Sequence, residues 1–169
     1  AAAALLCSAS MLKTLPGDTQ RRAVRVCSSQ LSGGKYRMLN EPGLSRVAAD
    51  KAYARSGLGP QDIDIVELHD ATAFCELYQL EMLRLCESGK GGEMAASGVT
   101  RLGGRLPVNL SGGLISKGHP VGATGLSMVY EVCLQLREEA GKRQAYGARV
   151  GLIENRSEEH TSELQSHSF

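Results

Sequence analysis

Two histidines stand where a predicted strand ends and a predicted helix begins. His69 directly follows the alternating apolar segment 62–68, and His119 lies in a glycine-rich stretch just before a segment of helical period. In open α/β sheets, ligands bind beyond the carboxyl ends of the strands, where helix N-termini direct backbone N–H groups toward the site. The helix dipole there disfavours an imidazolium, and a neutral imidazole can accept a thiol proton or donate to a developing oxyanion. Both properties are useful for acyl transfer.

Glycines surround His119 and indicate a backbone that turns sharply or passes close to a ligand. Gly112, Gly113 and Gly118 lack the Cβ atom that would keep a bound molecule at a distance. We expect the backbone of these three glycines to line a binding surface for the substrate or a cofactor.

Other interpretations of the same residues stay open. A histidine at the end of a strand is more often a cap or a packing residue, and glycine-rich loops precede helices in many α/β proteins. The stretch has neither the G-x-G-x-x-G spacing of a dinucleotide site nor the G-K-[ST] of a phosphate-binding P-loop. From residue types and spacing alone, the sequence predicts a small-molecule site near His69 and His119 and names no reaction.

The elements that must position these residues alternate between strands and helices. Apolar alternation, helical spacing and Gly or Pro boundaries predict each of them. The predicted strands are 2–7, 22–31, 62–68, 105–109 and 147–153; the predicted helices are 8–15, 44–56, 71–86 and 126–140, with loops at 87–104 and 110–125. We expect Ile63 and Ile65 to share one strand face, and Phe74 to lie on the apolar face of its helix. This order predicts an α/β domain with a partly parallel sheet.

Length and composition fit one such domain. The chain has 169 residues, 20 of them glycine, with 42% hydrophobic and 4% aromatic residues, and single domains run about 100 to 200 residues. The 19 Lys and Arg residues against 18 Asp and Glu give a net charge of +1, which offers no basic surface for nucleic acid. No apolar run approaches the roughly 20 residues that span a bilayer.

The cysteines argue against a metal site. Five of them are scattered along the chain without a C-x-x-C pair, at Cys7, Cys27, Cys75, Cys86 and Cys133. Their number and spacing predict neither a zinc site nor a disulfide framework and favour a reducing compartment.

The two ends of the sequence differ from the domain between them. Residues 156–169 have few large apolar side chains and no period of either kind, and the stretch RSEEHTSELQS is similar to the translation of a common sequencing-adapter oligonucleotide. We interpret residues 1–155 as one partial domain and residues 156–169 as a non-native tail that we expect to be disordered; a natural acidic tail is the alternative. The start, within an apolar run and without Met, leads us to expect a preceding segment.

Three motifs together resemble the C-terminal domain of the thiolase superfamily. They are VELHDAT at 66–72, LPVNLSGG at 106–113 and KGHPVGATG at 117–125. They occur in the family's order, and the most similar branch looks like the sterol-carrier-protein thiolases and the bacterial acetyl-CoA acetyltransferase-like proteins. The resemblance implies an α/β thiolase-like fold, here its truncated C-terminal half, with a mixed sheet and helices on both faces.

By this resemblance, His119 and His69 are the catalytic residues of an acyl-CoA acyltransferase. In the family, a cysteine of the N-terminal half takes the acyl group from coenzyme A. The histidine of the Gly-His-Pro loop, matched by His119, activates that cysteine and helps to form an oxyanion hole. The histidine of the His-Asp loop, matched by His69, helps to bind the thioester oxygen. The resemblance implies a coenzyme A thioester as substrate, no permanently bound cofactor and no metal.

The chain also departs from the family pattern. The half that carries the nucleophile is absent from the sequence, so we expect this chain alone to be inactive. Where sterol-carrier thiolases often have a cysteine followed by phenylalanine, the chain has Ala71 and Thr72. Cys75, one helical turn further, could stand in for that cysteine, although a helical cysteine is usually a small core residue. These differences keep a retro-aldol or decarboxylative variant open.

Functions of other classes stay open as well. A thiolase-like chain can be a non-catalytic lipid- or CoA-binding subunit, or a structural dimerisation module. We expect the full-length parent to act in lipid or sterol metabolism as a homodimer or hetero-oligomer, in the bacterial cytoplasm or, if eukaryotic, in the peroxisome. We expect the 169-residue chain by itself to be marginally stable or prone to aggregate, because a missing strand leaves an unpaired sheet edge.

Overall fold

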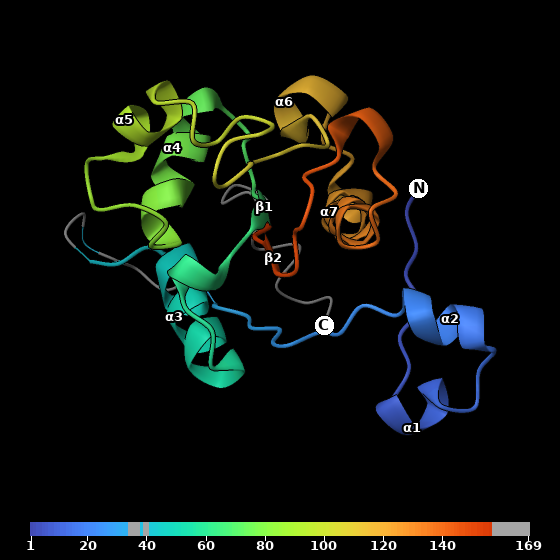
Figure 1. Ribbon diagram of the computed structural model, residues 1–169. Helices are drawn as coiled ribbons and strands as arrows, with labels where there is room; N and C mark the ends of the chain where they lie inside the picture. Colours follow the sequence, from blue (N-terminus) through green and yellow to red (C-terminus); the bar gives the residue numbers. More distant parts are fainter. Residues whose placement is uncertain (34–37, 39–40, 157–169) are drawn as a thin grey trace.

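A small parallel sheet lies between helices in the computed structural model, which describes residues 1–33, 38 and 41–156 (Figure 1). The elements are α1 (Ala9–Leu12), α2 (Gly17–Arg22), α3 (Leu44–Ser56), the 3-10 turn η1 (Pro60–Asp62), β1 (Ile65–Glu67), α4 (Ala73–Met82), α5 (Gly91–Ala96), α6 (Gly113–Lys117), α7 (Val121–Leu136), η2 (Gly141–Arg143) and β2 (Gly151–Ile153). The predicted α/β class is confirmed, and the strand pairs among the described residues are parallel, as predicted for part of the sheet.

The sheet brings the carboxyl ends of two distant segments to one edge. β1 pairs with β2 in parallel, with Ile65 opposite Gly151 and Glu67 opposite Ile153. A further parallel bridge joins Val66 to Val108 on the other side of β1. Residues that follow β1, β2 and Val108 therefore emerge at the same edge.

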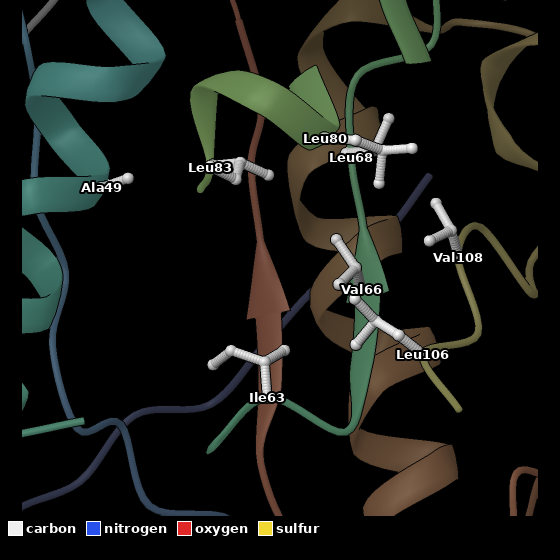
Figure 2. Close-up of a cluster of buried hydrophobic side chains, with 8 residues drawn as sticks. All are labelled: Ala49, Ile63, Val66, Leu68, Leu80, Leu83, Leu106 and Val108. Atoms are coloured by element: carbon white, nitrogen blue, oxygen red, sulfur yellow. The ribbon is translucent and has the colours of Figure 1, made fainter. Parts of the chain in front are cut away.

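Helices cover both faces of this sheet. Val66 and Leu68 belong to a buried cluster with side chains of α3 and α4 and of the segment beside β1; its other members are Ala49, Ile63, Leu80, Leu83, Leu106 and Val108 (Figure 2). The opposite face packs on α7, where Val132 lies so close to Gly151 that a Cβ atom there would stand 2.5 Å from the valine methyl group. The period-2 alternation of β1 thus divides its side chains between two helical layers.

One predicted face was wrong. Ile63 joins the cluster on the α3 and α4 side, whereas Ile65 lies on the α7 side, within 3.5 Å of the Cβ position of Gly151. The strand begins only at Ile65, after the η1 turn, so the strand alternation does not extend back to Ile63.

Two predicted strands near the N-terminus are also wrong. Residues 2–7 and 23–31 have no regular structure, and Arg22 ends helix α2. Alternating side chains favour a strand only where a neighbouring strand and a buried face exist, and here Leu5, Leu6, Val26 and Leu31 are exposed. In Figure 1 the blue segment with α1 and α2 lies to one side of the sheet. It contacts the rest through Arg22, whose guanidinium donates to Glu139 at 3.0 Å.

The bounds of most predicted elements differ from those in the structure, and helix α3 is an exception. Helix α3 has the predicted bounds and ends at Gly57, whose φ of 73° forms the left-handed cap. The predicted strands 62–68 and 147–153 shorten to β1 and β2, and 105–109 retains a single bridge. The helix predicted at 8–15 shortens to α1, and the loops predicted at 87–104 and 110–125 contain the short helices α5 and α6.

The two long apolar helices differ from the prediction, one in its buried face and the other in its bounds. The helix predicted at 71–86 is α4, and Phe74 in its first turn is 72% exposed, because Gln79 and Leu80 form its buried side. The helix predicted at 126–140 starts earlier, after the N-cap Pro120, and ends at Leu136. Its buried residues are Thr124, Met128, Glu131, Val132 and Gln135. Tertiary packing outweighs the weak helix propensity of the two glycines in its first turns.

The proposed tail at 156–169 falls outside the described residues except for Arg156. Among the helices that the structure describes, none is long and apolar enough to cross a membrane.

Candidate active site

The two histidines predicted from the sequence lie side by side at the carboxyl edge of the sheet. Their ring centroids are 4.9 Å apart and their planes meet at 86°, an edge-to-face arrangement. His69 is 4% exposed and His119 is half-buried. Two imidazoles distant in sequence thus lie in contact at one edge of the sheet.

His69 is fixed through the segment that follows β2. Its backbone N–H donates to Glu154 Oε2 at 3.2 Å, and the other oxygen of Glu154 accepts from the Ser45 hydroxyl of α3 at 2.7 Å. The Glu154 carboxyl is buried, which raises its pKa, while the hydrogen bonds from Ser45 and His69 act in the opposite direction. One buried carboxyl group therefore joins α3, β1 and β2 beneath the imidazole.

The ring of His69 has two polar neighbours at Nδ1. The backbone N–H of Arg156 lies 3.4 Å from this nitrogen, and Asn155 Oδ1, an acceptor, lies 3.3 Å from it. A contact with the Arg156 N–H favours the neutral tautomer with its proton on Nε2, whereas a contact with the Asn155 oxygen favours the tautomer with its proton on Nδ1.

The ring of His119 has a hydroxyl neighbour at Nδ1. The Thr124 hydroxyl oxygen, in the first turns of α7, lies 2.8 Å from His119 Nδ1 and 3.2 Å from the carbonyl oxygen of Pro120. When this hydroxyl donates to Pro120, its oxygen accepts from the Nδ1–H group. Nε2 of the neutral ring is then an acceptor, which is the state that a general base requires.

A carboxylate next to His69 holds the glycine loop that leads to His119. Asp70 is 3% exposed, and its Oδ1 accepts from the backbone N–H of Leu114, in the first turn of α6, at 2.6 Å. Gly113 has a φ of 61°, and a Cβ atom there would stand 2.1 Å from Asp70 Oδ2. The close approach of the two loops therefore requires glycine at this position.

The other two predicted glycines also have left-handed backbones. Gly112, with a φ of 100°, is the N-cap of α6, and Gly118, with a φ of 85°, ends that helix. Gly118 allows the chain to turn between α6 and His119, since this conformation is strained for other residues. Their predicted contact with a cofactor or substrate stays a prediction.

Several residues of the site were not predicted from the sequence. Asp70, Thr124 and Glu154 each position a histidine or its loop, yet each is a polar residue whose partner is in another part of the chain. Asp70 directly follows His69, and an acidic residue next to a candidate catalytic residue was the available signal. Glu154 carried no comparable signal, because only the fold brings it to His69.

Cys75 lies in the first turn of α4 and is half-buried. Thr72, the N-cap, accepts from the Cys75 backbone N–H at 3.2 Å, and its hydroxyl lies 3.2 Å from the cysteine sulfur. Ala71 and Thr72 are exposed. Among the residues that the structure describes, no cluster of His, Cys, Asp and Glu side chains has the arrangement of a metal site.

The chain belongs to the thiolase C-terminal domain-like family, whose family model matches residues 17–164. It is 44% identical over 163 residues to sterol carrier protein 2 of Oryctolagus cuniculus, a match that covers 92% of this chain and 29% of that protein. It is 41% identical over 160 residues to an acetyl-CoA acetyltransferase of Methanothermobacter thermautotrophicus, covering 92% of this chain and 41% of that protein. Both relatives are thus more than twice as long as the matched segment.

A solved structure has a similar fold. The Ltp2-ChsH2(DUF35) aldolase matches with a TM-score of 0.64 and 27% sequence identity, over 74% of this chain and 34% of that chain. The family predicted from the three motifs is confirmed, as is the thiolase-like fold.

Proposed function

We propose that the protein that carries this chain transfers acyl groups from coenzyme A thioesters, with His119 as the general base and His69 as a donor to the thioester oxygen. The edge-to-face pair of imidazoles, 4.9 Å between centroids, is the observation that supports the proposal most strongly. The proposal assigns the proton of His69 to Nε2, as the contact with the Arg156 N–H favours, and the proton of His119 to Nδ1, beside the Thr124 hydroxyl. One ring then donates and the other accepts at Nε2, which acyl transfer requires. The names of the relatives, which include an acetyl-CoA acetyltransferase, point the same way.

The reaction would proceed in two steps. A cysteine thiol from outside this chain gives its proton to His119 Nε2, and the thiolate attacks the carbonyl carbon of the acyl-CoA. The negative charge on the carbonyl oxygen is stabilised by the Nε2–H group of His69. The bond between the carbonyl carbon and the coenzyme A sulfur then breaks, and the departing thiolate takes the proton from His119. The acyl group remains on the cysteine for transfer to the second substrate.

The test uses the complete protein, because the chain spans 29% and 41% of the two relatives. Turnover of a 3-ketoacyl-CoA with free coenzyme A is measured for the native sequence, His119→Ala and His69→Ala. We expect each variant to lose on the order of 10² to 10³ in rate, the usual cost of removing one group from an oxyanion or proton-transfer site. Unchanged turnover in His119→Ala would show that the assigned role is wrong.

A retro-aldol reaction is the second candidate. The similar solved structure is named an aldolase, and the chain has Ala71 and Thr72 where sterol-carrier thiolases often have a cysteine and phenylalanine. An aldolase would cleave a 3-hydroxyacyl-CoA without free coenzyme A, whereas a thiolase requires free coenzyme A. Comparing the two substrates, with and without coenzyme A, separates the two reactions.

A binding function without catalysis is the third candidate, supported by the name of the sterol carrier relative. It predicts saturable binding of acyl-CoA with no product. An inert residue in place of the nucleophilic cysteine of the complete protein would favour it.

We propose a homodimer or hetero-oligomer for the complete protein, which sedimentation would test. We propose that it acts in the cytoplasm or the peroxisome, which cell fractionation would test.

A further inference from the structure

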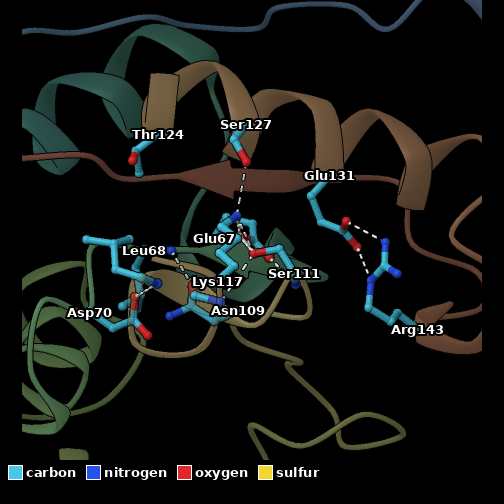
Figure 3. Close-up of polar contacts among 12 residues, drawn as sticks. Glu67, Leu68, Asp70, Asn109, Ser111, Lys117, Thr124, Ser127, Glu131 and Arg143 are labelled. Carbon is cyan, nitrogen blue, oxygen red and sulfur yellow. Dashed lines mark hydrogen bonds and ion pairs between the residues drawn. The ribbon is translucent and has the colours of Figure 1, made fainter. Parts of the chain in front are cut away.

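A buried carboxylate lies on β1, two residues before His69. Glu67 is 2% exposed. Its Oε1 accepts from the backbone N–H of Ser111 at 3.0 Å, and its Oε2 accepts from the Ser111 hydroxyl at 2.5 Å (Figure 3). An ionised carboxylate out of contact with water needs a cation or several hydrogen bonds. Glu67 has both, and the cation is Lys117.

The hydroxyl of Ser111 joins the two charged groups. Lys117 Nζ donates to Ser111 Oγ at 2.7 Å, and the backbone N–H of Gly113 donates to the same oxygen at 3.3 Å. A hydroxyl has one proton and two lone pairs. Because both lone pairs are engaged, its proton must go to Glu67, and the hydrogen bonds run in one direction from Lys117 through Ser111 to the carboxylate.

Lys117 directs its ammonium group toward partners inside the protein. Besides Ser111, its Nζ donates to the hydroxyl of Ser127 on α7 at 3.2 Å. It also forms an ion pair with Glu67 Oε2 at 3.8 Å, which is too long for a hydrogen bond. The side chain of Lys117 is 25% exposed, yet its charge is already paired with a buried carboxylate. It is therefore poorly suited to bind a phosphate of the substrate.

These contacts enclose the turn that carries His119. Ser111 lies before α6, Lys117 is the last residue of α6, and Ser127 lies in α7 beyond the turn. His119 is two residues after Lys117, and the intervening Gly118 offers no side chain to brace the turn. Lys117 is therefore fixed relative to β1 and α7 directly before Gly118, the residue of the turn with the greatest backbone freedom.

We propose that Lys117 is a positioning residue, which through Ser111, Glu67 and Ser127 locks the His119 turn against the end of β1. This inference rests on the proposed function for its effect on turnover, but its effect on the loop is independent of the reaction. A loop held in this way keeps His119 at one distance from His69, and a displacement of about 1 Å can cost on the order of 10² in rate.

The test compares Lys117→Met with Lys51→Met, an exposed lysine on α3, in the complete protein. Amide hydrogen exchange of residues 111–120 and the kinetic constants kcat and KM are measured for both. For Lys117→Met we expect exchange in 111–120 to rise at least about tenfold, kcat to fall roughly 10- to 100-fold, and KM to stay within about threefold. For Lys51→Met we expect none of these changes.

A double variant keeps the test informative if Lys117→Met does not fold. Glu67→Gln combined with Lys117→Met removes the buried charge together with its partner, and a buried pair replaced as a whole is tolerated better than one left half-paired. We expect the double variant to recover the thermal transition while exchange in 111–120 stays fast and kcat stays low. Recovery of native exchange in the double variant would overturn the proposal.

Two further results decide between positioning and substrate binding. A raised KM with native kcat and native exchange in 111–120 would show that Lys117 contacts the substrate, and the proposal would be wrong. If the native protein turns over no acyl-CoA, the proposed function fails, whereas faster exchange in Lys117→Met alone would still support the locking role.

Discussion

The carboxylate of Asp70 accepts a 2.6 Å hydrogen bond from the backbone N–H of Leu114, so the residue beside His69 directly holds the loop that leads to His119. The contact joins the end of β1 to the first turn of α6. This hydrogen bond explains why two loops distant in sequence hold the rings of His69 and His119 at a fixed distance. The distance also depends on Gly113, because a side chain there would push the loop away from Asp70.

Gly113→Ala is expected to destabilise the domain and separate the loops. The new Cβ atom would overlap Asp70 Oδ2 at a backbone φ of 61°. Left-handed strain and a lost hydrogen bond to a buried carboxylate together cost about 2 to 4 kcal/mol. Thermal or denaturant unfolding measures the loss. The matched control is Gly122→Ala, at a helical position with no atom within 4 Å of the new Cβ, where we expect no loss of stability. Equal stability of the two variants would contradict the contact.

Thr124→Val is expected to lower turnover by roughly 10²-fold through the tautomer of His119. Valine has the shape of threonine but no acceptor for the Nδ1–H group, which now lies 2.8 Å from the hydroxyl oxygen. Without that acceptor the proton can occupy Nε2, and the ring then offers no base to the thiol. Thr124→Ser retains the hydroxyl and should keep most of the rate. The pH dependence of kcat for the three proteins is the measurement, and native kinetics in Thr124→Val would refute the assigned tautomer.

Glu154→Gln is expected to change how stability depends on pH. Burial raises the pKa of Glu154, so the folded state binds this proton more tightly than the unfolded state does. The stability that this group contributes is present below the unfolded pKa, about 4.3, and is lost as the pH rises through the folded pKa. Glutamine is neutral and can still accept from the His69 N–H while it donates to Ser45.

The difference in Tm between Glu154→Gln and the native protein should therefore increase in favour of the variant as the pH rises above about 4.3. Glu87→Gln, on an exposed side chain, is the matched control. A Tm difference that is constant with pH, or that grows toward acid, would contradict the buried and unfavourable charge at Glu154.

Much of the site could be predicted because it depends on local signals. The bounds of α3 follow from helical spacing and a glycine cap, and β1 follows from the alternation before His69. The adjacency of His69 and His119 could be inferred because parallel strands bring their carboxyl ends to one edge. The three motifs in order then identified the family, which the family model at 17–164 confirms.

The remainder depended on partners that a local pattern does not specify. The segments 2–7 and 22–31 alternate like strands, but a strand requires a neighbour, and their apolar side chains are exposed. Glu154 lies 3.2 Å from the backbone nitrogen of His69 although the two are far apart in sequence. Polar contacts of this kind depend on the completed fold, and residue spacing alone did not predict them.

The most direct test of the acyl-transfer account is a double-mutant cycle on the histidine pair in the complete protein. If both rings, 4.9 Å apart, act on one thioester carbonyl, His69→Ala and His119→Ala should each lower kcat/KM by on the order of 10² to 10³. Groups that act as a unit give non-additive losses. The account predicts that the double variant loses about as much as the worse single variant. Losses that multiply, or single variants with native rates, would contradict it.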